Sequence, residues 1–498
     1  MNTARWFESS PLRPQRPECS RLPMEKLITQ SMSRPERTCF CLPRVFLIAA
    51  ALLLGPALAA LGQTPARRDS DDWPGFLGPL GNGVSAETGL LARWPEQGPP
   101  VLWKKTVGAG YAAPSVLGDR LVFFHRLADE EVVECINPET GETRWRFASP
   151  TRFADPYGYN GGPRCSPVLT ATRCFTFGAE GKLTCLDIAT GAKIWQRDTA
   201  KDFDIPQAFF GVGSTPVFHG GRLLVMLGGQ PRSGVVAFDA ATGKTCWESV
   251  GTGDFPDPPV RIQRDRPPAK LASYASPLVT TIHGKQHLLC FLRPGLVSLD
   301  PETGSIRFSV WCRSTLHDSV NAACPVVLGD QIFLSAAYDT GAMLLQVAPD
   351  GRSADVVWQD GDAMQTHWST AIEHRGYLYG FSGRNEAGAD LRCIRAQDGK
   401  MMWRSPAEPA FYGRGSALLA DGHLIVMGER GTLALVKLDP ESFREISRVK
   451  FAEFDHPCWT APVLSRKRLF ITGARQIPGP GGFSRDEYHL VCLDLAAD

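Results

Sequence analysis

The sequence predicts an all-β chain folded as an eight-bladed β-propeller, in which each blade is a four-stranded antiparallel sheet. One observation is a motif of the form Ala-x-Asp-x-x-Thr-Gly-x-x-x-Trp, which recurs along the 498 residues. A second is a Ser-Pro or Ala-Pro marker that opens each unit at intervals of 45 to 61 residues, close to the roughly 40 to 50 residues of a propeller blade. The markers, two of them without proline, fall at Pro114, Pro167, Pro216, Pro277, Pro325, Thr370, Ala417 and Pro462.

The recurring motif predicts a hairpin between the third and fourth strands of each blade. In the copy over residues 237–247, AFDAATGKTCW, Asp239 can accept hydrogen bonds from backbone N–H groups, and Gly243 can adopt a positive φ. Both faces of a blade are apolar and must be covered, so we expect the Trp that ends the motif to pack on the next blade, with its N–H on a backbone carbonyl. Trp103, Trp145, Trp195, Trp247, Trp358 and Trp403 hold this position.

The two ends of the repeat region predict how the ring closes. The segment VLWKKTV, residues 101–107, is a fourth strand with no first three strands before it. The last repeat ends at HLVCLDLAAD with a third strand and no fourth. Pairing of these N-terminal and C-terminal strands would complete the eighth blade and remove two exposed sheet edges.

The region before the propeller is divided into two parts. Residues 1–59 are interpreted as a signal peptide with an unusual N-terminal extension, because residues 44–62 form a short apolar run with the small-x-small site Ala57-Leu58-Ala59. Cleavage near Ala59 would make the protein periplasmic or secreted, with no transmembrane segment; an uncleaved anchor is the alternative. Residues 60–100 are a Gly/Pro-rich N-terminal clamp expected to lie over the propeller, and residues 101–498 form the propeller itself.

Charge and cysteine usage narrow the classes of partner. Removal of residues 1–59 leaves 45 basic and 48 acidic side chains and a net charge of about −3, with no basic run. This argues against nucleic acid as a partner. Eleven cysteines remain, and four of them share one phase of the repeat with Ala237 and Ser298, which is typical of small core residues and disfavours a disulfide framework. These four are Cys135, Cys185, Cys393 and Cys492.

The docking motif resembles that of the quinoprotein propellers, the family of the pyrroloquinoline quinone (PQQ) dehydrogenases and of the outer-membrane-assembly propeller BamB. The resemblance covers about Asp72 to Asp498. For a dehydrogenase it implies PQQ held between a Trp and a ring formed by two adjacent cysteines, with calcium bound by Glu, Asn and Asp. None of the cysteines in this sequence is adjacent to another, so one wall of that site is missing.

The repeat phase predicts which residues surround the channel entrance. The first strand of each blade lines the channel, so the residues three positions before the markers should form a ring around its entrance. Among the residues one position before these, only Asn321 could serve as a calcium ligand. The ring is aromatic and basic and contains no carboxylate, while Asp155, Asp318 and Asp455 are the nearest acids along the chain. The ring positions are Tyr111, Arg164, Gly213, Tyr274, Ala322, His367, Arg414 and Trp459.

Three interpretations of this ring remain open. It forms a site for a small anionic or sugar-like ligand held by stacking and hydrogen bonds, or a quinone and calcium site, or an aromatic plug without a ligand. The leading hypothesis is a binding or scaffolding propeller with a small ligand or an envelope protein as partner. The alternative is a PQQ-dependent sugar or alcohol dehydrogenase, with no catalytic residue assigned. The predicted ligand-binding residues are Tyr111, Arg164, Tyr274, Asn321, His367, Arg414 and Trp459.

Overall fold

The computed structural model describes residues 71–206, 210–257, 271–316, 319–407, 412–455, 457–478 and 484–497. The chain divides into a unit of residues 1–65 and a unit of residues 66–498, and only the second contains described residues. The predicted signal peptide and Asp318 therefore lie outside the described residues.

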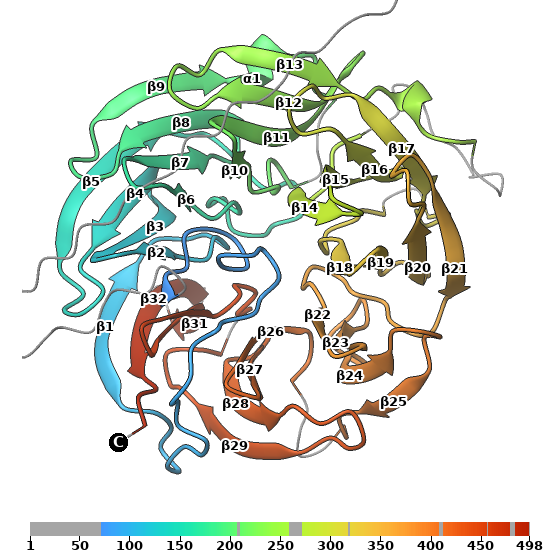
Figure 1. Cartoon of the computed structure of the whole chain (residues 1–498). Coiled ribbons are helices and arrows are strands. Elements are labelled where there is room, and N and C mark those ends of the chain that lie inside the picture. Colours follow the sequence, from blue (N-terminus) through green and yellow to red (C-terminus); the bar gives the residue numbers. More distant parts are fainter. Residues whose placement is uncertain are drawn as a thin grey trace, which may run out of the picture. The chain divides into compact units, whose positions relative to one another are not determined.

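The described strands form eight four-stranded antiparallel sheets around a central channel, which confirms the predicted eight-bladed propeller (Figure 1). Within each blade the chain runs from the innermost strand outward. Blades 1 and 2 contain β2 (Ser115–Leu117), β3 (Arg120–Leu127), β4 (Glu130–Ile136) and β5 (Thr143–Pro150), then β6 (Val168–Leu169), β7 (Arg173–Phe177), β8 (Lys182–Asp187) and β9 (Lys193–Asp198). Blades 3 and 4 contain β10 (Val217–His219), β11 (Arg222–Gly229), β12 (Ser233–Asp239) and β13 (Thr245–Ser249), then β14 (Leu278–Ile282), β15 (Lys285–Leu292), β16 (Gly295–Leu299) and β17 (Ile306–Trp311).

The second half of the ring repeats this order. Blades 5 and 6 contain β18 (Val326–Leu328), β19 (Gln331–Ala336), β20 (Gly341–Val347) and β21 (Ala354–Asp360), then β22 (Ile372–His374), β23 (Tyr377–Ser382), β24 (Asp390–Arg395) and β25 (Met401–Arg404). Blade 7 contains β26 (Gly415–Ala420), β27 (His423–Gly428), β28 (Thr432–Lys437) and β29 (Glu445–Lys450). Two short helical turns, α1 (Thr199–Asp202) and a 3₁₀ turn (Thr252–Asp254), follow blades 2 and 3.

Blade 8 joins the two ends of the described chain. It contains β30 (Val463–Ser465), β31 (Arg468–Pro478) and β32 (Ser484–Asp494), and its outermost strand is β1 (Val101–Val107). The register pairs Trp103 with Cys492 and Val107 with Tyr488. The predicted closure of the ring by N-terminal and C-terminal strands is therefore confirmed.

The docking tryptophans hold neighbouring blades together, as the motif predicts. The indole of Trp195 in blade 2 donates its Nε1–H to the carbonyl of Ala240 in blade 3, at 3.0 Å. Trp103, Trp145, Trp358 and Trp403 make the equivalent bond to the carbonyls of Pro138, Ile188, Ala396 and Asp439. Trp247 is the exception, because its buried Nε1 has no hydrogen-bond partner in the described structure.

A small residue lies opposite five of these six indoles within the blade, and Leu344 lies opposite the sixth, Trp358. Cys135 pairs with Trp145, Cys185 with Trp195, and Cys393 with Trp403, in the register of the third and fourth strands. These thiols are fully buried. These three repeats thus place a compact apolar side chain across from a large one. All eleven described cysteines are free thiols, and only Cys246 is exposed.

Hydroxyl groups next to the markers connect the innermost strands of successive blades. The backbone N–H of Ala113 in blade 1 donates to Ser166 Oγ in blade 2, at 3.2 Å. In the same way the backbone N–H of Ser166 donates to the Thr215 hydroxyl, that of Thr215 to the Ser276 hydroxyl, and that of Cys324 to the Thr370 hydroxyl. The marker therefore combines a small hydroxyl, which satisfies the preceding blade, with a proline that has no N–H to satisfy.

The first part of residues 71–100, shown in blue in Figure 1, lies over the inner strands, and the part around Trp94 reaches β29 at the outer edge of blade 7. Trp73 exchanges two backbone hydrogen bonds with Val116 of β2, and Pro74 accepts one from Leu169 of β6. Across the channel, Leu419 of β26 donates to Gly83 and accepts from Ser85. The segment thus contacts blades on different sides of the channel. No helix in the described part of the chain has the length and apolar character needed to cross a membrane.

Candidate functional site

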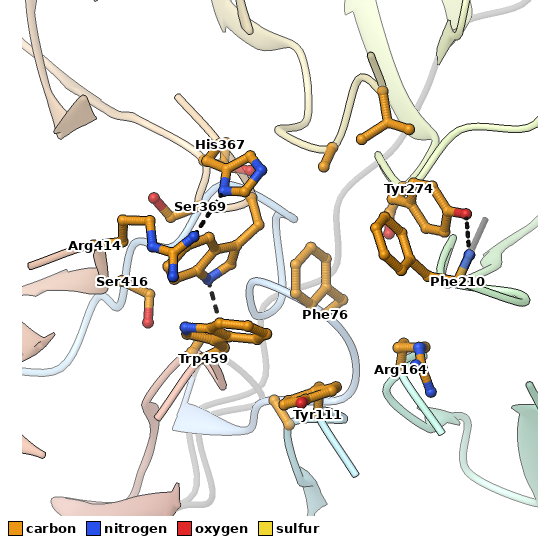
Figure 2. A pocket seen from close by; sticks show the side chains of 18 of the residues that line it. Phe76, Tyr111, Arg164, Phe210, Tyr274, His367, Ser369, Arg414, Ser416 and Trp459 are labelled. Carbon is orange, nitrogen blue, oxygen red and sulfur yellow. Dashed lines mark hydrogen bonds between the residues drawn. The ribbon is translucent and has the colours of Figure 1, made fainter. Parts of the chain in front are cut away.

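A cavity of about 490 Å³ occupies the channel entrance, at the ends of the innermost strands where the blade-to-blade loops begin (Figure 2). Its volume falls within the roughly 300 to 1,000 Å³ of small-molecule sites. All eight positions of the predicted ring line this cavity. The repeat phase therefore located residues that share one cavity.

Asn321 is the one predicted site residue that does not line the cavity. Its side chain is buried in the wall and donates to the carbonyls of Leu292, Arg293 and Cys312, at 2.9 to 3.3 Å. Neighbouring residues of an extended backbone point in opposite directions, so the residue directly before a cavity residue points into the protein. Asn321 thus satisfies backbone carbonyls of blade 4 and its outgoing loop.

The N-terminal segment contributes the inner end of the cavity. Phe76 and Leu77 line it, and Figure 2 shows the Phe76 ring projecting into its middle. This segment bonds to Val116 within β2, whereas Tyr111 precedes the start of that strand. The side chains of Phe76 and Leu77 therefore approach the mouth residues from the opposite end of the channel.

Aromatic side chains from the blade-to-blade loops surround the mouth. Trp459 has three ring neighbours, with centroids 5.2 Å away in Tyr111 and Tyr159 and 5.4 Å away in Trp368. On one side the ring of Tyr159 contacts Phe210, which contacts Tyr274. On the other side the ring of Trp368 contacts His367, which contacts Tyr338. We call these eight side chains together with Tyr157 the aromatic belt: Tyr111, Tyr157, Tyr159, Phe210, Tyr274, Tyr338, His367, Trp368 and Trp459.

Five of the belt residues were missed from the sequence. Tyr157 and Tyr159, which are 54% and 43% exposed, come from the loop between β5 and β6, and Phe210 comes from the next such loop. These loops differ in length from blade to blade, so they carry no repeat phase. Trp368 could have been found, because it directly follows His367.

Arg164 is paired with a buried carboxylate behind the belt. Its Nη2 lies 2.7 Å from Asp155 Oδ2, and it also donates to the carbonyls of Asn160 and Gly162. The Asp155 side chain is fully buried. The guanidinium also lies 5.7 Å from the centroid of the Tyr111 ring. The charge of Arg164 is therefore balanced inside the wall.

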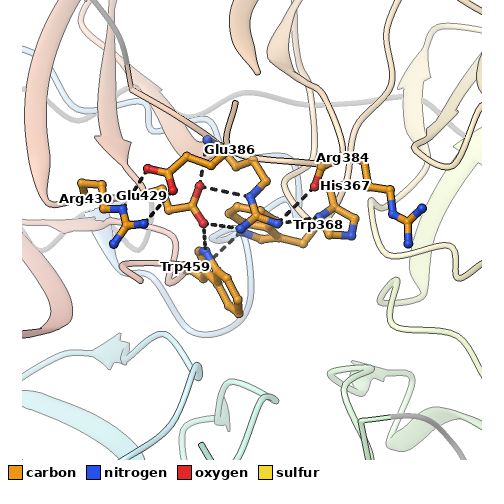
Figure 3. Close-up of polar contacts among 8 residues, drawn as sticks. His367, Trp368, Arg384, Glu386, Glu429, Arg430 and Trp459 are labelled. Carbon is orange, nitrogen blue, oxygen red and sulfur yellow. Dashed lines mark hydrogen bonds and ion pairs between the residues drawn. The ribbon is translucent and has the colours of Figure 1, made fainter. Parts of the chain in front are cut away.

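Arg414 is paired in the same way on another side of the cavity. Its Nε donates to Glu429 Oε2 at 3.0 Å, and its Nη2 donates to Oε1 of the same carboxylate. Glu429 is 2% exposed and also accepts the indole N–H of Trp459, at 2.8 Å, as Figure 3 shows. Glu429 lies in the turn between β27 and β28 and was not predicted from the sequence. Arg164 and Arg414 therefore each already have a counter-charge in the wall.

The hydrogen bonds of His367 determine which of its ring nitrogens carries the proton. Burial, and then the nearby Arg414 and Arg384, lowers the pKa of His367 to about 4, so the imidazole is neutral at neutral pH. Arg414 Nη1 can only donate, so His367 Nδ1, 3.4 Å away, accepts. The ring proton is then on Nε2, which donates to the Tyr338 hydroxyl at 3.2 Å.

Tyr111, Tyr274 and Tyr338 remain protonated at neutral pH. Burial raises the pKa of Tyr111 to about 12, and burial also raises the pKa values of Tyr274 and Tyr338. Tyr274 Oη accepts the backbone N–H of Phe210, at 2.7 Å. These phenols can therefore act as neutral hydrogen-bond donors.

The cavity residues do not fit the calcium and quinone arrangement implied by the resemblance. Calcium requires six to eight oxygen ligands. Among the described residues no group of three His, Cys, Asp or Glu side chains is placed to hold a metal ion. Asp155 and Glu429 are each paired with an arginine, and Asp455 is exposed and accepts from the backbone of Gln476. The carboxylates near the cavity are thus committed to other partners.

Comparisons with known proteins find other propellers with a similar fold. The family model described as outer membrane protein assembly factor BamB matches residues 128–358. BamB from Moraxella catarrhalis is 13% identical, with a TM-score of 0.52, over 79% of this chain and 99% of that chain. A search of curated proteins finds no match.

Two enzymes with solved structures are also similar. Quinohemoprotein alcohol dehydrogenase from Comamonas testosteroni is 14% identical, with a TM-score of 0.57, over 85% of this chain and 81% of that chain. The enzyme of that name from Pseudomonas putida HK5 is 12% identical, with a TM-score of 0.58, over 86% and 81%. The eight four-stranded blades define the class of protein, an eight-bladed β-propeller, and the matching family model covers its residues 128–358. Within that class the chain resembles BamB and the quinohemoprotein alcohol dehydrogenases in fold.

Proposed function

We propose that this protein is a binding propeller of the cell envelope whose channel cavity takes a small sugar-like ligand. The observation that carries the proposal is the aromatic belt around a 490 Å³ cavity that also contains inward hydroxyl groups. A pyranose ring has apolar C–H faces and a rim of hydroxyl groups. Aromatic faces cover the first, and neutral donors and acceptors satisfy the second.

The charge state of the wall favours a polar ligand of low charge. Asp155 and Glu429 balance Arg164 and Arg414, and Tyr111, Tyr274, Tyr338 and His367 are neutral. A ligand with several negative charges would find little net positive potential to offset its desolvation. The same hydrogen bonds and ring contacts hold the wall in one arrangement, which reduces the entropy lost on binding.

The envelope location rests on the sequence and on the named relatives. Residues 44–62 have the pattern of a secretory signal. The matching family description names outer membrane protein assembly, which supports an envelope setting and makes a protein partner the alternative to a small ligand. A PQQ-dependent dehydrogenase remains the alternative enzyme, supported by the fold of the solved relatives and opposed by the lack of a calcium-binding carboxylate group among the described residues.

Titration of the purified protein tests these alternatives together. Thermal unfolding is followed with a panel of monosaccharides, disaccharides and their uronic acids, and separately with PQQ plus calcium. A bound ligand at 100 times its Kd stabilises the native state by about 2.7 kcal/mol. We expect a shift with at least one sugar. A shift with PQQ and calcium alone, accompanied by dye-linked alcohol oxidation, would replace the proposal with the dehydrogenase.

A pair of aromatic variants tests where the sugar binds. Tyr159→Ala removes a belt residue that is 43% exposed, and we expect about tenfold weaker binding. Phe218→Ala is the matched control, because Phe218 is 39% exposed and does not line the cavity. Equal affinities for both variants would contradict binding at the belt.

A further inference from the structure

Arg384 is a cavity residue whose charge is not balanced by a carboxylate. It lines the cavity from the loop between β23 and β24, and its side chain is exposed. No acidic side chain lies within ion-pair distance of it in the described structure, whereas Arg164 and Arg414 each have one. Its guanidinium carbon lies 4.4 Å from the centroid of the Tyr338 ring. The described cavity wall thus carries a surplus of one positive charge.

The Tyr338 hydroxyl adds a directed donor beside this charge. Because His367 Nε2 donates to Tyr338 Oη, the phenolic hydrogen is not used in that bond. No other partner of this hydroxyl is found among the described residues, and the Tyr338 side chain lines the cavity. A ligand atom that accepts this hydrogen would therefore sit next to the Arg384 guanidinium.

The backbone around Tyr338 is held in a conformation that is unfavourable for its residue types. Tyr338 and Asp339, in the turn between β19 and β20, have φ values of 62° and 61°. Positive φ at both central residues is the geometry of a type I′ hairpin turn, which residues other than glycine, asparagine and aspartate adopt unfavourably. Ser314 stabilises the turn by donating its hydroxyl to the Tyr338 carbonyl.

From these observations we propose that the ligand is a sugar acid with one carboxylate, which Arg384 and Tyr338 bind at the cavity mouth while the ring lies against Trp368 and Trp459. A carboxylate matches the single surplus charge and accepts hydrogen bonds from both donors. Trp368 contacts both His367 and Trp459, so the apolar wall begins next to the anion-binding pair. This inference rests on the proposed sugar-binding function and adds the charge that the ligand carries.

Isothermal titration with matched sugars tests the inference. D-glucuronate and D-galacturonate are compared with D-glucose and D-galactose, which have the same rings without the carboxylate. We expect at least one acid to bind tenfold or more tightly than its neutral partner at low ionic strength, with a smaller preference in high salt. Arg384→Gln should abolish the preference, and Tyr338→Phe should reduce it several-fold.

Arg352→Gln is the control for overall charge. Arg352 is an exposed arginine in the turn between β20 and β21 and does not line the cavity. It should leave the preference unchanged. Equal binding of acids and neutral sugars overturns the inference and leaves the proposed function standing. A preference that survives Arg384→Gln also overturns it, and binding of neither class overturns both.

Discussion

The indole of Trp195 lies directly against Gly243 of the next blade. A Cβ atom on Gly243 would come 2.8 Å from the indole ring, and the glycine has a φ of 72°. Gly141, Gly191, Gly304 and Gly399 stand in the same relation to Trp103, Trp145, Trp247 and Trp358. The spacing of Thr-Gly and Trp in the repeat is thus set by contact between neighbouring blades.

We predict that Gly243→Ala destabilises the protein by about 3 kcal/mol. The new methyl group would require both an unfavourable backbone conformation and displacement of Trp195. Gly422→Ala is the matched control, because Gly422 has a φ of 73° and no heavy atom within 4 Å of its Cβ position. It should cost only about 1 kcal/mol in chemical denaturation. Equal losses for the two variants would show that the glycine is required for its backbone alone.

Replacement of docking tryptophans by phenylalanine should separate hydrogen bonding from packing. Trp195→Phe leaves the Ala240 carbonyl without its donor and should cost about 1 to 3 kcal/mol. Trp247→Phe should cost less, because the Trp247 N–H has no partner to lose. Phe308 already holds the equivalent position in blade 4. A larger loss of unfolding free energy for Trp247→Phe than for Trp195→Phe, measured by urea denaturation, would contradict this account.

The sequence predicted the blades because every blade repeats the same contacts. Trp195, Gly243 and the marker hydroxyls form recurring interactions, so their spacing recurs as well. The eight positions of the ring were found for the same reason. Glu429 and Arg384 were not, because they lie in turns within single blades and act through contacts far apart in sequence. Asn321 was assigned to the mouth although its side chain points into the wall.

The contribution of Glu87, in the N-terminal segment, to the free energy of unfolding should depend on pH. Glu87 accepts the backbone N–H of Arg466 at 2.9 Å, and burial raises the pKa of its carboxyl to about 7. The native state therefore holds this proton more tightly than the unfolded state. Its contribution to the free energy of unfolding, up to about 3 kcal/mol, is complete below pH 4.5 and is lost as the pH rises through 7.

The comparison of wild type with Glu87→Gln measures this contribution. The free energy of unfolding of the wild type should fall relative to that of the variant between pH 4.5 and pH 7. A difference between the two proteins that is constant over this range would mean that Glu87 titrates normally.

The ion pair behind Trp459 should stabilise the fold as well as set the cavity charge. Glu429→Gln leaves Arg414 without its counter-charge, and we predict a loss of about 3 kcal/mol together with stronger binding of sugar acids. Glu302→Gln is the control, since Glu302 is 51% exposed in its pair with Arg222 and should contribute less than about 1 kcal/mol. Similar losses for the two variants would mean that the Arg414–Glu429 pair is screened by solvent as strongly as the exposed Arg222–Glu302 pair.

A crystal structure of the protein with the tightest-binding sugar of the panel tests the central claim most directly. We predict that the sugar ring occupies the cavity against Trp368 and Trp459, with the carboxylate of a uronic acid within hydrogen-bond distance of Arg384. A sugar bound elsewhere on the protein, or an empty cavity at saturating sugar concentration, would contradict the account.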